Sequence, residues 1–237
     1  MFLAVKNMFK SYQSESVLCG VSLELDAHQT LAILGKSGCG KTTLLKAIAG
    51  LTPAAGQIYV QGRDINLLKP QLRSAVYLYQ EPLLFPHFSV FENIAFGLRL
   101  RKLALPEIDR RTAQMLEDLE LAKYCHKMPH ELSGGQKQRV AFGRALIVQP
   151  MLLLLDEPFA SLDPETRSNM QALFKRLTAE HGITSLFVTH DLKEALKMGD
   201  RLGYMEGGKL DLFPDYAAFA ADVRTGMNAE IEFWKKL

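Results

Sequence analysis

The sequence of 237 residues lacks long hydrophobic runs and has almost no excess of charge. No stretch of 18 apolar residues occurs, so no membrane-spanning helix is predicted, and the charges and amides of the first dozen positions are unlike an export signal. Lysine and arginine number 28, against 26 for aspartate and glutamate, a balance that gives no general attraction to nucleic acid or anionic lipid. We therefore expect a cytoplasmic protein with no nucleic-acid partner.

Cysteine is scarce as well. Cys19, Cys39 and Cys125 are widely spaced and form neither a CxxC pair nor a Cys/His cluster, so neither a disulfide framework nor a zinc site is indicated, and a reducing compartment fits best. Repeats, low-complexity tracts and long linkers are also absent. With 48% hydrophobic residues, a chain of this length can bury its core as one domain.

The order of apolar patterns predicts an α/β fold with a helical insertion. The first segment alternates apolar and polar residues in places, at Phe2 and Ala4 and then at Leu23 and Leu25. The apolar run 31–34 then stops at Gly35, which predicts strands entering a glycine turn. Helical periodicity follows from Lys41, and residues 88–149 are rich in helix formers. The apolar runs 151–155 and 184–188 are typical of parallel strands covered on both faces.

A phosphate-binding loop lies between the strand ending at 34 and the helix starting at 41. Its sequence fits G-x-x-x-x-G-K-[ST], whose glycines let backbone N–H groups surround a polyphosphate at a helix N-terminus. The predicted nucleotide ligands are Gly35, Lys36, Ser37, Gly38, Cys39, Gly40, Lys41, Thr42 and Thr43. Lys41 is expected to reach the β- and γ-phosphates and Thr42 to ligate Mg²⁺, while the helix N-terminus is expected to lower the pKa of Cys39.

Two acids end the second apolar strand. Asp156 and Glu157 follow the run 151–155, at the strand end where open α/β sheets bind their ligands. Asp156 is a candidate for holding Mg²⁺, and Glu157 is a candidate for activating the water that attacks the γ-phosphate. Alone, such a pair fits a solvated turn equally well. Beside the phosphate loop, the two acids predict ATP and Mg²⁺ as substrate and cofactor.

The pentapeptide Leu132-Ser133-Gly134-Gly135-Gln136 resembles the signature of the ABC ATPase family. Its serine and glycines at a helix start are suited to a γ-phosphate. The resemblance covers nearly the whole chain in the family's order. It implies that Ser133, Gly134, Gly135 and Gln136 of one subunit close over the phosphate loop of a second copy, in a symmetric ATP-dependent dimer with two composite sites.

The resemblance implies roles for four further residues. Tyr12 matches the aromatic that stacks on adenine, although Gln13 stands where a glycine is frequent. Gln80 matches the glutamine that senses Mg²⁺ and the attacking water, and His190 matches the switch histidine that contacts the γ-phosphate. Asp163 matches the aspartate of the loop that crosses the dimer interface. Lys41, Gln80, Glu157 and His190 are thus the candidate catalytic residues, and Thr42, Gln80 and Asp156 the candidate metal residues.

The family's fold implies a domain organisation. It is a P-loop NTPase (RecA-like) core with an antiparallel β subdomain and an inserted helical subdomain. We expect the core in residues 1–87 and 150–220, the helical signature subdomain in 88–149, and a short C-terminal helical tail in 221–237. Some relatives carry a regulatory β-domain after the ATPase; since the sequence stops where it would begin, we expect none.

The segment 80–98 resembles that of bacterial importer ATPases for sugars, polyamines, sulfate, molybdate or iron. There it receives a helix of the membrane subunit, and the rings of Phe85, Phe88, Phe91 and Phe96 suit such a contact, although half of them could instead fill the core. We expect membrane permease partners, a solute-binding protein, and a location on the cytoplasmic face of the inner membrane. The alternatives are a non-transport ABC ATPase of DNA repair or translation, or an exporter or lipid-extraction ATPase.

Overall fold

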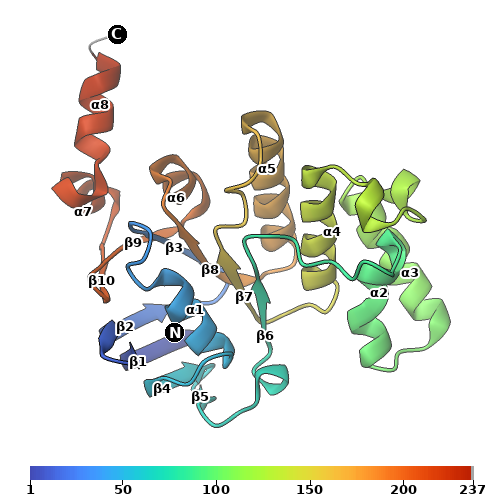
Figure 1. The fold of residues 1–237 in the computed structure, drawn as a ribbon, viewed down its shortest axis with the longest axis horizontal. Helices are drawn as coiled ribbons and strands as arrows, with labels where there is room; N and C mark the ends of the chain where they lie inside the picture. The colour runs from blue at the N-terminus through green and yellow to red at the C-terminus, as the bar shows by residue number, and fades with distance from the viewer. Residues whose placement is uncertain (236–237) are drawn as a thin grey trace.

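The computed structural model describes residues 1–235 and contains two sheets with helices around them (Figure 1). The strands are β1 (Leu3–Tyr12), β2 (Glu15–Leu25), β3 (Thr30–Leu34), β4 (Ala55–Val60), β5 (Arg63–Asp64), β6 (Ala75–Leu78), β7 (Leu152–Asp156), β8 (Thr184–Thr189), β9 (Arg201–Glu206) and β10 (Lys209–Leu212). The helices are α1 (Lys41–Ala49), α2 (Val90–Leu100), α3 (Leu105–Asp118), α4 (Gly134–Leu146), α5 (Pro164–Glu180), α6 (Leu192–Met198), α7 (Tyr216–Ala221) and α8 (Met227–Lys235). Among these described residues, no helix is long and apolar enough to cross a membrane.

The larger sheet determines where the functional residues meet. Its strand order is β10-β9-β3-β8-β7-β6, and all neighbours run parallel except β9 and β10. Strands β3, β8 and β7 are therefore adjacent, and the segments that follow them leave the sheet at the same edge. In open α/β sheets the ligand site lies at this carboxyl edge.

Both faces of this sheet are buried, as the continuous apolar runs predict. Along β7, Leu152 and Leu154 contact the core that includes α1, while Leu153 and Leu155 contact the core that includes α4 and α5. Successive strand side chains point to opposite faces, so a run of four leucines contributes equally to two cores. The predicted strands at 151–155 and 184–188 are confirmed within one residue.

The smaller sheet packs against the other side of α1. Its order is β2-β1-β4-β5, with antiparallel pairs. Apolar side chains from β1, β2 and β4 share one core with α1 and with β3, β7 and β8. The phosphate-loop helix is thus held between the two sheets, which fixes the loop before it.

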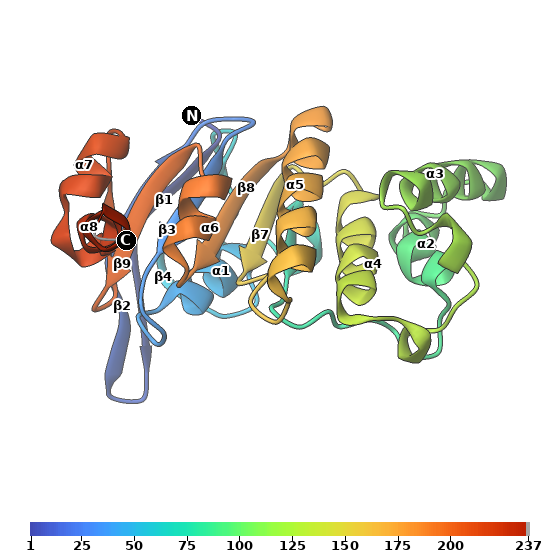
Figure 2. The same ribbon diagram turned by 90° about the horizontal axis from the view of Figure 1, so that it is seen from above.

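The predicted helical segment 88–149 contains α2, α3 and α4, which lie at one end of the molecule, while α7 and α8 lie at the other (Figure 2). Helix α2 begins with a capping box, in which Ser89 and Glu92 satisfy each other's backbone N–H groups. Helix α4 contacts α2, α5 and β6 and so joins the helical segment to the sheet. Of the expected tail 221–237, residues 236–237 lie outside the described residues.

Candidate functional site

The phosphate loop connects β3 to α1 and depends on glycine where its backbone is tightest. Gly38 and Gly40 have φ of 81° and 108°, a region that L side chains rarely adopt. A Cβ at Gly35 would lie 2.4 Å from the carbonyl oxygen of Met205. The buried Lys41 folds back along the loop and donates from Nζ to the carbonyl oxygens of Gly35 (2.6 Å) and Lys36 (3.0 Å). The glycines therefore determine the conformation of the loop, and the two hydrogen bonds hold the Lys41 ammonium group against it.

Asp156 lies at the end of β7 with a hydrogen-bond donor on each carboxylate oxygen. The Thr42 hydroxyl donates to Oδ1 at 2.9 Å, and the Tyr77 hydroxyl donates to Oδ2 at 2.6 Å. Burial and the adjacent Asp156 raise the pKa of Tyr77 far above its usual range, so the phenol keeps its proton and remains a donor.

Sequence reasoning missed Tyr77. The aromatic, strand-forming stretch 75–79 was the available signal. Only the parallel pairing of β6 with β7, in which Tyr77 is level with Leu154, places the phenol beside Asp156. A short edge strand does not reveal its partner or its register from local sequence.

Glu157 contacts two of the other candidate catalytic residues. Its φ of 45° turns the chain out of β7, and its backbone N–H donates to the carbonyl oxygen of Val188 at 3.1 Å. The carboxylate then lies 3.6 Å from Lys41 Nζ and 2.6 Å from His190 Nδ1. Glu157 is 16% exposed and His190 54%, so this end of the cluster faces solvent, where a substrate can enter.

These residues surround one open hollow of about 430 Å³. Its lining consists of Val17, Ser37, Gly38, Gly40, Lys41, Thr42, Thr43, Gln80, Glu157 and His190. The phosphate loop, the glutamine after β6, the acid after β7 and the histidine after β8 therefore come together, although they are up to 153 positions apart in sequence, from Ser37 to His190. Such a hollow, lined by backbone N–H groups, one lysine and a carboxylate, suits a polyphosphate.

Tyr12 lies near the first turn of α1. Its hydroxyl is 3.4 Å from Thr52 Oγ1, and the Nζ of Lys10 lies 4.7 Å from its ring centroid. Hydrogen bonding to Thr52, and to a smaller extent to Thr43, lowers the pKa of Tyr12. The residue is 46% exposed, which leaves its ring accessible to a planar base.

The signature residues do not join this hollow within one chain. Ser133 caps α4, with its hydroxyl accepting from the N–H of Gln136, and Ser133, Gly135 and Gln136 line a different hollow of about 320 Å³. Asp163 caps α5 by accepting from the N–H of Thr166 at 3.0 Å. A Cβ at Gly135 would lie 2.4 Å from Cγ2 of Thr166, whereas one at Gly134 would meet nothing within 4 Å.

The expected low pKa of Cys39 is wrong. Burial is the largest influence on this thiol and raises its pKa, outweighing the nearby charge of Lys41. The side chain packs against the core that includes α1, and its Sγ would lie 2.9 Å from a Cβ at Gly35. The Cys39 side chain therefore packs between the loop and this core. Its apolar surroundings raise the pKa of the thiol more than the helix N-terminus lowers it.

The oxygen donors present fit Mg²⁺ held together with a nucleotide. Within residues 1–235 no group of three or more His, Cys, Asp or Glu could hold a metal by itself. Magnesium at nucleotide sites needs only one or two protein oxygens, because phosphates and water complete its coordination. The Thr42 hydroxyl and the Asp156 carboxylate, 2.9 Å apart, are such a pair.

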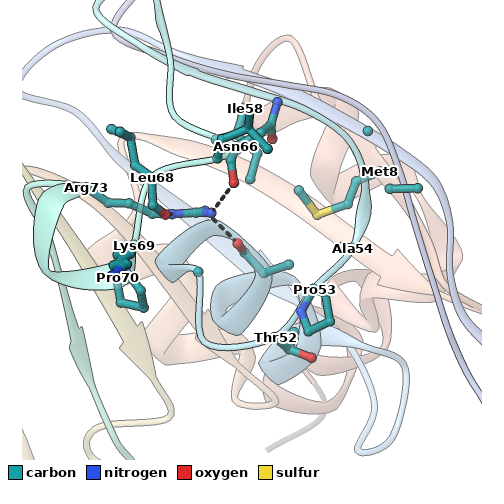
Figure 3. A pocket seen from close by; sticks show the side chains of 15 residues that line it. Met8, Thr52, Pro53, Ala54, Ile58, Asn66, Leu68, Lys69, Pro70 and Arg73 are labelled. Atoms are coloured by element: carbon teal, nitrogen blue, oxygen red, sulfur yellow. Dashed lines mark hydrogen bonds between the residues drawn. The ribbon is translucent and has the colours of Figure 1, made fainter.

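A separate pocket of about 340 Å³ lies at the far end of α1 (Figure 3). Arg73 donates there to the carbonyl oxygens of Ala47 (3.0 Å) and Ile48 (2.9 Å), and its other nitrogens donate to carbonyl oxygens of the loop before it. A cation at the C-terminal carbonyls of a helix is favourable. Because the guanidinium nitrogens of Arg73 already donate to backbone carbonyl oxygens, we infer that Arg73 anchors the end of α1.

A largely parallel sheet, with a glycine-rich phosphate loop between β3 and α1 and with acids at the end of β7, one strand away from β3, defines a P-loop NTPase. The sequence profile described as ABC transporter matches residues 18–160. The chain belongs to the ABC transporter family.

Named relatives support this membership over most of the chain. A spermidine/putrescine import ATP-binding protein of Nitrosomonas eutropha is 44% identical over 88% of this chain and 58% of the relative. A molybdate/tungstate import ATP-binding protein of Pyrococcus horikoshii is 46% identical over 88% and 60%. An sn-glycerol-3-phosphate import ATP-binding protein of Ruegeria pomeroyi is 42% identical over 89% and 60%. The chain thus spans about three fifths of the length of these relatives.

Proposed function

We propose that this chain binds Mg-ATP, hydrolyses it at an interface between two copies of itself, and drives import of a solute across a membrane. The observation that carries the proposal is the single hollow lined by the phosphate loop, Gln80, Glu157 and His190. Its features match the chemistry of phosphoryl transfer to water, which needs positioned phosphates, neutralised charge and an oriented nucleophile.

The roles of the residues follow from their contacts. Lys41 would exchange its bonds to loop carbonyls for phosphate oxygens, and loop N–H groups would bind the remaining oxygens. Thr42 and Asp156 would hold Mg²⁺, which supplies neutralisation of the phosphate charge. Glu157 would accept a proton from the attacking water. His190, 2.6 Å from Glu157, would orient that carboxylate and reach the γ-phosphate, and Tyr12 would stack on the adenine.

A second copy would complete the site. Ser133, Gly134, Gly135 and Gln136 form a helix start suited to phosphate, and Ser133 and Gly135 line a hollow apart from the phosphate loop of their own chain. Closure of the signature of one copy, with Asp163 near the interface, over the ATP of the other would bury the nucleotide. ATP would then stabilise the closed dimer, and hydrolysis would release it.

The transport role rests on the relatives. Those described above are named as import ATP-binding proteins for spermidine/putrescine, for molybdate/tungstate and for sn-glycerol-3-phosphate. Since solutes so different accompany similar chains, we infer that other subunits choose the solute. Permease subunits and a solute-binding protein would be the partners, and this chain would lie at the cytoplasmic face of the inner membrane.

The docking site for a permease helix would be the aromatic cluster after Gln80. Phe85, Phe88 and Phe96 contact one another with ring centroids 4.6 to 6.0 Å apart and are half-buried. Phe91 instead packs against the core that includes α2 and α4. A helix bound at these half-buried rings would contact the segment that follows Gln80 in sequence, and Gln80 itself lines the nucleotide hollow.

Size exclusion with mass detection tests the proposal on Glu157→Gln protein with and without Mg-ATP. Loss of the proton acceptor should slow turnover about a hundredfold or more while leaving ATP binding intact. We expect an ATP-dependent dimer with this variant. Glu180→Gln, an exposed change at the end of α5, should behave as the unmodified chain. Near-normal turnover in Glu157→Gln, or a persistent monomer with ATP bound, would contradict the proposal.

A further inference from the structure

We propose that Tyr77 is a positioning residue for magnesium, whose hydroxyl fixes the Asp156 carboxylate so that Asp156 and Thr42 present a preformed pair of oxygens to the metal. This inference rests on the proposed function and deepens it. Tyr77 touches neither nucleotide nor metal in this scheme and acts only through Asp156.

The two hydrogen bonds to Asp156 determine the orientation of its carboxylate. Tyr77 donates to Oδ2 at 2.6 Å and Thr42 donates to Oδ1 at 2.9 Å, and the aspartate is only 8% exposed. A carboxylate held at both oxygens cannot rotate without breaking a bond in a poorly hydrated place. Each oxygen still has lone-pair capacity, because a carboxylate can accept about four hydrogen bonds.

The same bond orients Thr42. A hydroxyl has one hydrogen and two lone pairs; since Thr42 gives its hydrogen to Asp156, its lone pairs are directed elsewhere and are available to a cation. If Asp156 turned, Thr42 would lose this acceptor and its hydroxyl would rotate freely. Fixing Asp156 therefore also fixes the second metal ligand.

The element that carries Tyr77 is suited to hold a group in place. Tyr77 belongs to β6, which pairs in parallel with β7, the strand that ends in Asp156. Its ring packs against the core that includes α1 and meets Tyr79 edge-on, with centroids 4.6 Å apart. Partners of metal ligands that come from rigid elements lower the cost of ordering the site when the metal binds.

Tyr79 offers a matched control. It lies two residues along the same segment and contacts the ring of Tyr77, but its hydroxyl makes no hydrogen bond to any other residue of the described chain, and the residue is 40% exposed. Tyr77→Phe and Tyr79→Phe delete the same atom from neighbouring rings. Only the first removes a bond to Asp156.

The experiment measures binding, not turnover. In one titration, a fluorescent ATP analogue is added to each protein in EDTA. In a separate titration without EDTA, Mg²⁺ is added to each protein at fixed nucleotide. Mn²⁺ binding measured by electron paramagnetic resonance gives a second readout. For Tyr77→Phe we expect unchanged affinity for the analogue in EDTA and a half-saturating Mg²⁺ concentration raised about tenfold, as is typical when the partner of a metal ligand is lost. Tyr79→Phe should match the unmodified chain in both titrations.

Each other outcome has a definite meaning. An unchanged Mg²⁺ response in Tyr77→Phe would overturn the inference and leave the proposed function intact. An equal loss of affinity with and without metal would show a general structural role for Tyr77 and would also overturn it. If the unmodified chain bound the analogue without any effect of Mg²⁺, the assignment of Asp156 and Thr42 to the metal would fail, and the proposed function with it.

Discussion

At the scale of one residue, Glu157 has a strained backbone conformation that places its carboxylate among the candidate catalytic residues. Its φ of 45° lies in the left-handed region, which costs a non-glycine residue on the order of 1 kcal/mol. The bend removes the carboxylate from the line of β7 and brings it to Lys41 and His190. A glutamate that continued the strand would point into one of the two cores, so the strained conformation serves the site.

Cys39 provides a residue-scale prediction with a defined sign. Because burial raises its pKa, the fraction of reactive thiolate at any given pH is smaller than for an ordinary thiol near 8.5. We expect alkylation by iodoacetamide to be slow at neutral pH and to keep rising through and beyond the usual thiol range. Mass spectrometry of the Cys39 peptide across a pH series measures this rate.

The shape of that pH profile separates ionisation from access. Poor access alone would lower the rate at every pH without moving the plateau, and a plateau below about pH 8 would contradict the raised pKa. In guanidinium the same peptide should titrate as an ordinary thiol. Mg-ATP should slow labelling in the folded chain, since phosphates would close the loop over the side chain.

At the scale of elements, the start of α4 packs against the start of α5 through a glycine. A Cβ at Gly135 would lie 2.4 Å from Cγ2 of Thr166, so Gly135→Ala should destabilise the fold by about 1 to 3 kcal/mol through overpacking. Gly134→Ala meets open space and should be neutral or gain about 0.5 kcal/mol from helix propensity. Thermal unfolding of the two variants measures the difference.

A second substitution tests whether the clash is the cause. Thr166→Ser removes Cγ2 and keeps the hydroxyl and the backbone N–H that binds Asp163. In the Gly135→Ala background it should restore most of the lost stability, a coupling between neighbours that independent sites do not show. Equal destabilisation by Gly134→Ala and Gly135→Ala would contradict this account of the contact.

Local sequence predicted the elements with long continuous patterns. The strands β7 and β8, the glycine loop and the helix after it all follow from apolar runs and a loop motif within one short stretch. Strands β9 and β10 and the pairing of β6 did not follow, because their short runs carry no signal for which strand they join. The bond from Tyr77 to Asp156 and the burial of Cys39 depend on that packing, and so escaped prediction.

At the scale of the whole molecule, the two halves of the proposed site lie in different hollows of one chain. Lys41, Glu157 and His190 line one, and Ser133 and Gly135 line the other. If the signature acts on the second copy, one chain can lack a working phosphate loop and its partner can lack a working signature, and the pair still contains one complete site. This gives a test of the dimer that no single variant provides.

The test mixes two variants in a Glu157→Gln background, one with Lys41→Ala and the other with Ser133→Arg. Lys41→Ala should weaken nucleotide binding, and Ser133→Arg should spare binding but block closure by its bulk, so neither should dimerise alone with Mg-ATP. Mixed, the two should form a heterodimer, because the intact phosphate loop of one faces the intact signature of the other. Native mass spectrometry resolves the three dimers by mass once one variant is isotopically labelled. If signature and phosphate loop acted within the same chain, no mixed dimer would form, since each chain would carry one defect in its only site.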